Sequence, residues 1–387
     1  MRASTRATLA RIAVWTTGGL IALAAGAVLF AWSGIYSVAA SSGHFAITRW
    51  FLHFAMQNSV ETHASETPPP PLTDPGLVQL GAGHYYGGCA PCHGAPGDTG
   101  SPVVDRMLPP PPSLASAARD WTTNELFWIV WHGIKYTGMP AWPAHHRWDE
   151  VWPVVAFLQR LPQMSPEEYR TLAIGTTSPR EPGARTLALA GSTEISIAAC
   201  ARCHGADGER PRSELVPTLN GQRFEYLRTA LANYATAVRP SGIMQPIAVE
   251  LSADEIEKLA AYYAGLAPSA PASAEPADPE LIALGGQLAA TGDPSRGVPA
   301  CHSCHAPGKA PHYPRLAGQN ERYILGQLSL WRRGGRIGHE AARIMATIAN
   351  RLTDAQVRAV AAYFSHLEPQ PETATLAGDA PPRAGAE

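Results

Sequence analysis

The sequence predicts an all-α protein in which an N-terminal transmembrane helix is followed by three small helical domains. Three observations predict this: a long uncharged stretch near the N-terminus, a C-x-x-C-H string that occurs three times, and an internal repeat of helix signals. The 387 residues suit two to four domains. With 45% apolar and 16% charged residues, compact cores are expected. The net charge of −2 gives no reason to expect a nucleic-acid partner.

The uncharged stretch has the features of a membrane anchor. Its apolar core, Val14–Tyr36, would span roughly 34 Å as a helix, which is enough for a bilayer. Arg2, Arg6 and Arg11 precede it, and no charged residue follows before Arg49, so we expect a cytoplasmic N-terminus and a periplasmic remainder. The alternative is a signal peptide cleaved near Val38-Ala39-Ala40. Because the apolar stretch is long for a signal peptide, we expect a retained single-pass anchor in a bacterial inner membrane.

All six cysteines belong to the C-x-x-C-H strings, and a histidine directly follows the second cysteine of each. The residues are Cys89, Cys92 and His93; Cys200, Cys203 and His204; and Cys301, Cys304 and His305. This string is the attachment signature of c-type haem, with the thiols bound to the porphyrin and the histidine on the iron. A redox dithiol or half of a zinc site are the alternatives. Three copies without any further cysteine favour three haem c groups.

Proline-rich segments at 67–75, 176–183 and 268–279 divide the chain into units. We expect a cytoplasmic N-terminus and anchor (1–44), a juxtamembrane helix with a proline-rich linker (45–76), and three haem domains (77–172, 181–267 and 280–368). A disordered tail (369–387) is expected to follow. The juxtamembrane helix, Phe45–Thr62, is rich in aromatic residues, and we expect it to lie at the membrane surface or to pack on the first domain.

The second and third domains are an internal repeat. The interval from His204 to His305 equals that from Met244 to Met345. After each methionine comes a helix with a capping signal, Ser252-x-x-Glu255 in one unit and Thr353-x-x-Gln356 in the other. The first unit shares this plan more loosely, with an apolar helix at 148–161 that Pro153 would kink or begin.

The iron needs a sixth ligand if the protein is to be an electron carrier. From 181 to 266 the only histidine is His204 and the only methionine is Met244, which makes Met244 the candidate. Met345 repeats this position, and Met139 is the corresponding residue of the first unit. Alternatives in the first unit are Met107, Met164, His132, His145 and His146. The carbonyls of Pro112, Pro217 and Pro314 are candidates to accept a hydrogen bond from the axial histidine rings.

These strings resemble class I cytochromes c. Units two and three are similar to tandem di-haem periplasmic cytochromes of that class, through Cys200–Gly208, Pro217–Gln222 and Pro314–Gln319, while Gly87–Trp142 resembles a single domain. The resemblance implies a small helical fold around each haem, with histidine and methionine on the iron. Ala306 departs from the usual Cys-His-Gly string.

The function expected from these features is electron transfer. The donor would be a quinol oxidiser or a dehydrogenase, and the acceptor a terminal oxidase or a soluble carrier. Because methionine fills the sixth position, an enzyme such as a haem peroxidase with one open haem is the less favoured alternative. Four arginines of unit three (Arg332, Arg333, Arg336 and Arg343) are predicted to form either a basic patch that steers an acidic partner or only a solvated face.

Overall fold

The computed structural model describes residues 2–64, 67–98, 100–175, 193–205, 210–270, 278–336, 338 and 340–370. Within these ranges the regular elements are helices, apart from one isolated bridge between Asp293 and Val298. The all-α prediction is therefore confirmed. The predicted linker at 176–183 and most of the predicted tail lie outside the described residues.

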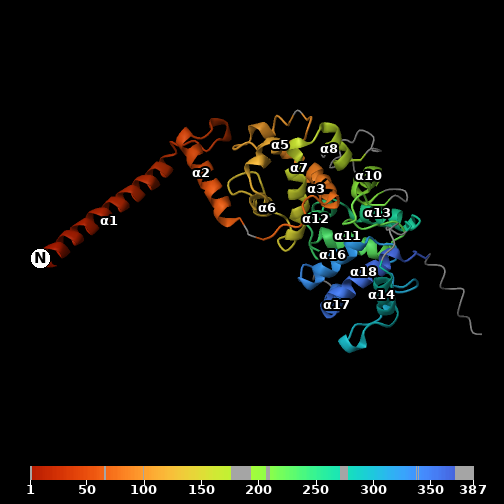
Figure 1. The fold of residues 1–387 in the computed structure, drawn as a ribbon. Coiled ribbons are helices and arrows are strands. Elements are labelled where there is room, and N and C mark those ends of the chain that lie inside the picture. The colour runs from red at the N-terminus through yellow and green to blue at the C-terminus, as the bar shows by residue number, and fades with distance from the viewer. Residues whose placement is uncertain are drawn as a thin grey trace, which may run out of the picture.

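The N-terminal helix α1, Arg2–Ser33, extends away from a compact helical body (Figure 1). Its segment Thr8–Ser33 is long and apolar enough to cross a membrane, and none of that segment is buried against the rest of the chain. After the short helix η1, Ala40–Ser42, comes α2, Ala46–His63, one residue displaced at each end from the helix expected there. Helix α2 packs on α6, where the ring centroids of His63 and Trp128 are 6.1 Å apart, and Val60 of α2 is fully buried.

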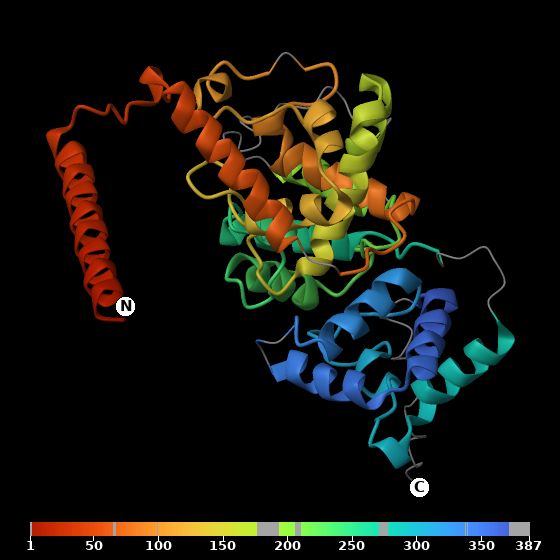
Figure 2. The ribbon, with the colours of Figure 1, turned by 60° about the vertical axis from the view of Figure 1, so that its left-hand side comes forward.

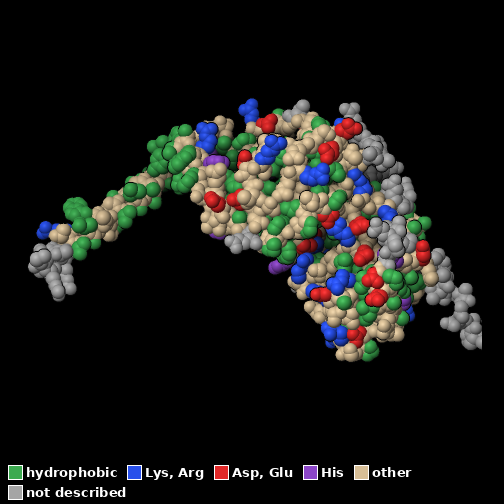
Figure 3. Space-filling view, in the orientation of Figure 1, with side chains coloured by type: hydrophobic (Ala, Val, Ile, Leu, Met, Phe, Trp, Pro, Cys, Tyr) green, Lys and Arg blue, Asp and Glu red, His purple; other side chains and the backbone are tan. Residues whose placement is uncertain are grey.

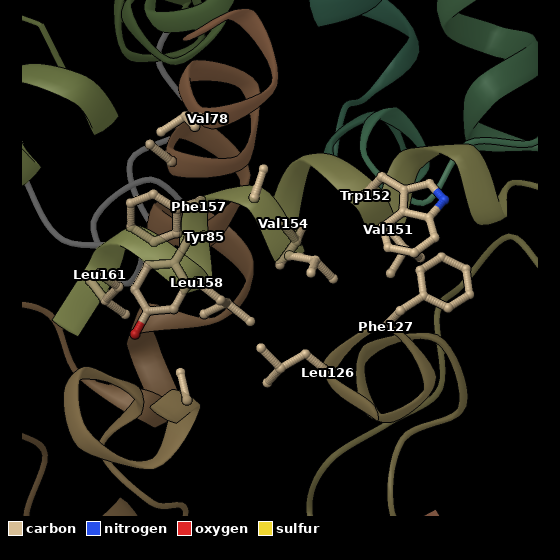
Figure 4. Close-up of a cluster of buried hydrophobic side chains, with 14 of the residues drawn as sticks. Val78, Tyr85, Leu126, Phe127, Val151, Trp152, Val154, Phe157, Leu158 and Leu161 are labelled. Atoms are coloured by element: carbon tan, nitrogen blue, oxygen red, sulfur yellow. The ribbon is translucent and has the colours of Figure 1, made fainter. Parts of the chain in front are cut away.

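Unit one is built around α3 and α7. Its elements are α3 Pro75–Gly88, α4 Ala90–His93, η2 Val104–Arg106, α5 Leu114–Ala117, η3 Ala118–Asp120, α6 Thr123–His132, η4 Trp148–Glu150, α7 Val151–Arg160, η5 Leu161–Gln163 and α8 Pro166–Ala173. Pro153 lies in the first turn of α7, where its missing N–H costs no hydrogen bond. Aromatic and aliphatic side chains of α3, α6 and α7 fill the core (Figure 4), including Tyr85, Phe127 and Phe157.

Units two and three repeat one helical plan. Unit two contains α10 Thr193–His204, α11 Phe224–Ala235, α12 Met244–Ala248 and α13 Ala253–Gly265. Unit three contains α14 Pro279–Thr291, η6 Pro294–Arg296, α15 His302–His305, α16 Glu321–Arg332, α17 Glu340–Arg351 and α18 Asp354–His366. Both predicted capping boxes are formed, Ser252 with Glu255 and Thr353 with Gln356. The repeat is imperfect at the methionines, since Met244 begins a short helix and Met345 lies inside a longer one.

The three units pack directly against one another (Figure 2). Unit three reaches unit one through an ion pair between Arg322 and Asp74, and the hydrogen bond from Arg322 lowers the pKa of Asp74. Arg333 of unit three also lies over the ring of Trp148, 4.9 Å from its centroid. The proline-rich linkers therefore join domains that are in contact rather than spacing them apart.

A glycine allows two helices to cross closely in each of units one and three, α3 with α7 and α14 with α18. A Cβ atom on Gly81 would lie 1.9 Å from the carbonyl oxygen of Pro153 in α7. A Cβ atom on Gly285 would lie 2.2 Å from the carbonyl oxygen of Ala359 in α18. Because the obstacle is backbone in both cases, a side chain cannot be accommodated without moving the helices apart.

Replacing Gly285 with alanine should destabilise unit three by about 1–3 kcal/mol, the usual cost of overpacking a core. Gly326→Ala in α16 is the matched control, because no atom lies within 4 Å of the new Cβ and alanine favours the helix by up to about 1 kcal/mol. Chemical unfolding of both variants provides the measurement. Equal stability of the two variants would show that the crossing of α14 and α18 is not constrained by this glycine.

Candidate haem-binding sites

Each C-x-x-C-H string forms a helical turn. In units one and three the string makes the short helices α4 and α15, and in unit two it ends α10. The N–H of His93 donates to the carbonyl of Cys89 at 2.9 Å, and that of His305 to Cys301 at 3.0 Å. Residues four apart in a helical turn lie on one face. The turn therefore presents the first thiol and the histidine on the same side, as attachment of one flat group requires.

The first cysteine of each string does not have the property expected of a redox dithiol. All six are free thiols in the structure. Burial raises the pKa of Cys89 and of Cys200 to about 12, and that of Cys301 to about 11. Redox-active C-x-x-C pairs instead have a lowered thiol pKa. The redox alternative is accordingly disfavoured.

The motif histidines are held in one orientation by proline carbonyls, as the sequence predicted. The Nδ1–O distances are 2.9 Å for His93 and Pro112, 2.9 Å for His204 and Pro217, and 2.8 Å for His305 and Pro314. With Nδ1 donating to the carbonyl, Nε2 is left as the ligand atom. Burial lowers the pKa of His204 and of His305, which favours the neutral ring that a metal requires.

One continuous cavity brings together the predicted residues of units two and three. Its walls include Cys200, His204 and Met244 of unit two and Cys301, Cys304, His305 and Met345 of unit three. Cys203 lies outside this cavity, and its Sγ atom faces Gly83 of unit one. The structure thus places each predicted histidine and methionine of the repeat on a common wall.

In unit one the structure disfavours Met164 and His132 as the sixth ligand but does not distinguish Met107 from Met139. Met164 is 9% exposed and packs in the core, which is the role of a filler side chain. His132 is exposed and its ring contacts two tryptophans, Trp128 and Trp131. Met107 and Met139 are both half-buried and approach the same loop, since a Cβ on Gly138 would lie 2.2 Å from Met107 Cε.

Two buried arginines lie between units two and three. The sequence did not predict that they form a pair. Arg239 and Arg336 are 6% and 7% exposed, and both line the cavity of the repeat. Among the residues that the structure describes, neither forms an ion pair with a carboxylate, and Arg336 Nε has no hydrogen-bond partner. Although burial acts in the opposite direction, the two guanidinium groups lower the pKa of Tyr226 to about 8.

This excess of buried positive charge fits a haem. Uncompensated buried charge is costly, so a pair of guanidinium groups is expected to face an anion. A haem carries two carboxylates, the propionates, beside its iron. The same cavity therefore offers thiols, imidazoles, thioethers and a cationic end, which are the groups that c-type haem needs, and Cys203 is the one predicted attachment residue of the repeat outside it.

The predicted basic patch of unit three is wrong for Arg336 and Arg332, and Arg333 contributes to a contact with unit one. Arg336 is buried, and Arg333 lies on Trp148 of unit one. Arg332 pairs with Asp354 and donates to two backbone carbonyls of its own unit. Arg333 and Arg343 are exposed as expected. The arginines are drawn into contacts between helices and units, which their spacing in the sequence does not reveal.

A carboxylate of unit one holds the loop that precedes Met244. Glu150 is 7% exposed and accepts hydrogen bonds from Ser241 Oγ at 2.6 Å and from the Gly242 N–H at 2.5 Å. Ser241 Oγ in turn accepts from the Met244 N–H at 3.0 Å. Arg147 completes the cluster with a contact of 2.7 Å to Glu150. The position of Met244 therefore depends on unit one as well as on unit two.

Comparison with known proteins agrees with this geometry. Residues 76–158 and 188–262 match the family model described as "Cytochrome C oxidase, cbb3-type, subunit III", and residues 282–368 match the model "Cytochrome c". A "Thiosulfate dehydrogenase electron acceptor" of Thiomonas intermedia is 37% identical over 171 residues, 43% of this chain and 78% of that protein. "Cytochrome c4" of Pseudomonas aeruginosa is 32% identical over 182 residues, 46% of this chain and 88% of that protein. A solved cytochrome c4 structure from Acidithiobacillus ferrooxidans has 33% identity and a TM-score of 0.40, covering 43% of this chain and 98% of that one.

The chain belongs to the cytochrome c family, and it contains tandem units like those of its di-haem relatives. Proteins of this family carry covalently bound haem c and transfer electrons. Electron transfer is the function of this chain, and its relatives favour that function over the haem peroxidase considered as the alternative.

Replacing Glu150 with alanine should lower the free energy of unfolding by about 3 kcal/mol. That value is at the low end for breaking a buried ion pair, because Asp149 still neutralises Arg147 at 3.1 Å. The control is Glu168→Ala, whose partner Arg160 is 3.5 Å away with both side chains about half exposed, and which should change stability by less than about 1 kcal/mol. Denaturant titration of both variants tests this expectation, and similar losses would contradict it.

Proposed function

We propose that the chain is a membrane-anchored electron carrier with three haem c groups, one for each C-x-x-C-H string. Thioether bonds would form at Cys89 and Cys92, Cys200 and Cys203, and Cys301 and Cys304. The proposed iron ligands are His93 and Met139, His204 and Met244, and His305 and Met345. The observation that supports this most is the single cavity of units two and three, whose walls carry both members of two of these pairs.

Histidine and methionine on opposite sides of the iron suit a carrier. Bound haem supplies a one-electron couple, and a thioether ligand raises its potential relative to two histidines. These residues would hold the iron from both sides, which would leave no coordination site for a substrate. In unit one we assign the ligand to Met139 rather than Met107, because Met139 precedes the last large helix of its unit as Met244 does.

The proposed partners are redox proteins rather than small molecules. Two of the relatives are named as electron acceptors of a thiosulfate dehydrogenase. By analogy, this chain would accept electrons from a periplasmic dehydrogenase or a quinol oxidiser and pass them to a terminal oxidase or a soluble carrier. Co-purification of the full chain from solubilised membranes would identify the donor.

The proposed location is the periplasmic face of a bacterial inner membrane. Helix α1 supplies a span, and hydrophobic side chains continue from it onto α2 (Figure 3). Six of those on and just before α2 are exposed: Phe45, Ile47, Trp50, Phe51, Leu52 and Phe54. The opposite end of α2 packs on α6 of unit one, where His63 lies beside Trp128. We infer that α2 lies in the membrane interface and holds unit one close to the lipid.

Met244→Ala should open the second iron without releasing its haem, because attachment depends on Cys200 and Cys203. The oxidised protein should lose part of the weak red-edge absorbance of methionine-ligated iron and should bind carbon monoxide after reduction. Met164→Leu is the control, because Met164 packs in the core and its loss should leave the spectrum unchanged. An unchanged Met244→Ala spectrum would exclude this residue as a ligand.

Two truncations should separate the roles of α1 and α2. With a cleavable signal supplied, a chain that begins at Phe45 should still bind vesicles through its exposed aromatic residues. A chain that begins at Ala64 should not bind them, although the loss of the packing between α2 and α6 should lower its stability. Vesicle sedimentation of both proteins gives the measurement. Equal binding would show that α2 is not the interfacial element.

A further inference from the structure

Two equivalent glutamines form hydrogen bonds between units two and three. Gln222 and Gln319 occupy matching places in the repeat, and each is 6% exposed. Gln319 Oε1 accepts from the Thr218 N–H at 2.9 Å, and its Nε2 donates to the Thr218 carbonyl at 3.0 Å. Gln222 makes the same two contacts with Arg315 of unit three, at 2.7 Å and 3.1 Å. The arrangement is reciprocal, as in a two-fold symmetric interface.

The peptide groups that the glutamines bind are the ones that orient the axial histidines. The N–H of Thr218 and the carbonyl of Pro217 belong to one peptide group, and that carbonyl accepts from His204 Nδ1 at 2.9 Å. The N–H of Arg315 and the carbonyl of Pro314 likewise form one group, which accepts from His305 Nδ1 at 2.8 Å. Each histidine is thereby connected, through a single peptide, to a glutamine of the other unit.

We propose that Gln222 and Gln319 are positioning residues that tune the haem of the opposite unit. This inference rests on the proposed haem ligation by His204 and His305. A peptide that donates through its N–H becomes a better acceptor at its carbonyl, because hydrogen bonds in a chain polarise one another. The stronger acceptor draws the Nδ1 proton of the histidine and makes the ring a more basic ligand.

The sign of the effect follows from this polarisation. A more basic ring stabilises ferric iron and lowers the reduction potential. Gln319 therefore lowers the potential of the second haem, and Gln222 lowers that of the third. Docking of the two units and the potentials of their haems are coupled by the same two side chains, so separation of the units would raise both potentials.

The test uses the full holoprotein with three variants: Gln319→Leu, Gln222→Leu and the exposed control Gln287→Leu of α14. Gln319→Leu should raise the midpoint potential of the second haem and shift the ring-proton resonance of His204, with little change at the third haem. Gln222→Leu should raise the potential of the third haem and shift the resonance of His305. The control should move neither potential. Potentials are assigned to haems by NMR during the redox titration.

In this expected pattern each substitution changes the potential of the haem in the opposite unit. A merely structural role of the glutamines would not produce it. A shift confined to the variant's own unit, an equal shift of both haems, or no shift in either variant would overturn the proposal. An equal shift would mean that the substitution only separates the units. Haem content by mass spectrometry and the red-edge absorbance of the same samples report attachment and methionine ligation separately. A failure of the proposed function is therefore distinguishable from a failure of the glutamine coupling.

Discussion

The hydrogen bond from each motif histidine to a proline carbonyl organises the rest of the structure. It fixes the ring so that Nε2 is available to iron, and it fixes the loop that carries the proline. In units two and three the N–H of the same peptide group donates to a glutamine of the neighbouring unit, so the two units dock at this group. One contact thus serves the ligand geometry of a unit and the packing between units.

Contacts between units reach both sides of the second site. Glu150 of unit one holds the Ser241–Met244 loop, while Gln319 of unit three holds the peptide that receives His204. Buried polar groups need hydrogen-bond partners. The partners of Glu150 and Gln319 lie mainly in a neighbouring unit. The middle unit therefore depends on its neighbours at the two positions where an iron ligand would be set.

The sequence predicted the parts of the site that depend on local spacing. The C-x-x-C-H turns, the capping boxes at Ser252 and Thr353 and the proline acceptors each follow from residues a few positions apart or from the repeat. It did not predict the contacts that depend on how the units dock. Arg336 was expected at the surface and is buried with Arg239, because the repeat places these two arginines opposite one another. The matching strings at Gln222 and Gln319 were visible as a repeat, but a repeat alone does not reveal that each copy binds the other.

Unit order along the chain does not set the order of contact in space. Unit three touches unit one through Arg322 and Asp74, and Arg333 covers Trp148. Three units in mutual contact give shorter distances between sites than three units joined end to end, and electron transfer between proteins and within them weakens with distance. Of the four arginines predicted to form a docking patch for an acidic partner, Arg333 instead contributes to this contact between units. Part of the predicted basic patch therefore serves contacts inside the molecule, with Arg336 buried and Arg333 on Trp148, whereas Arg343 stays exposed.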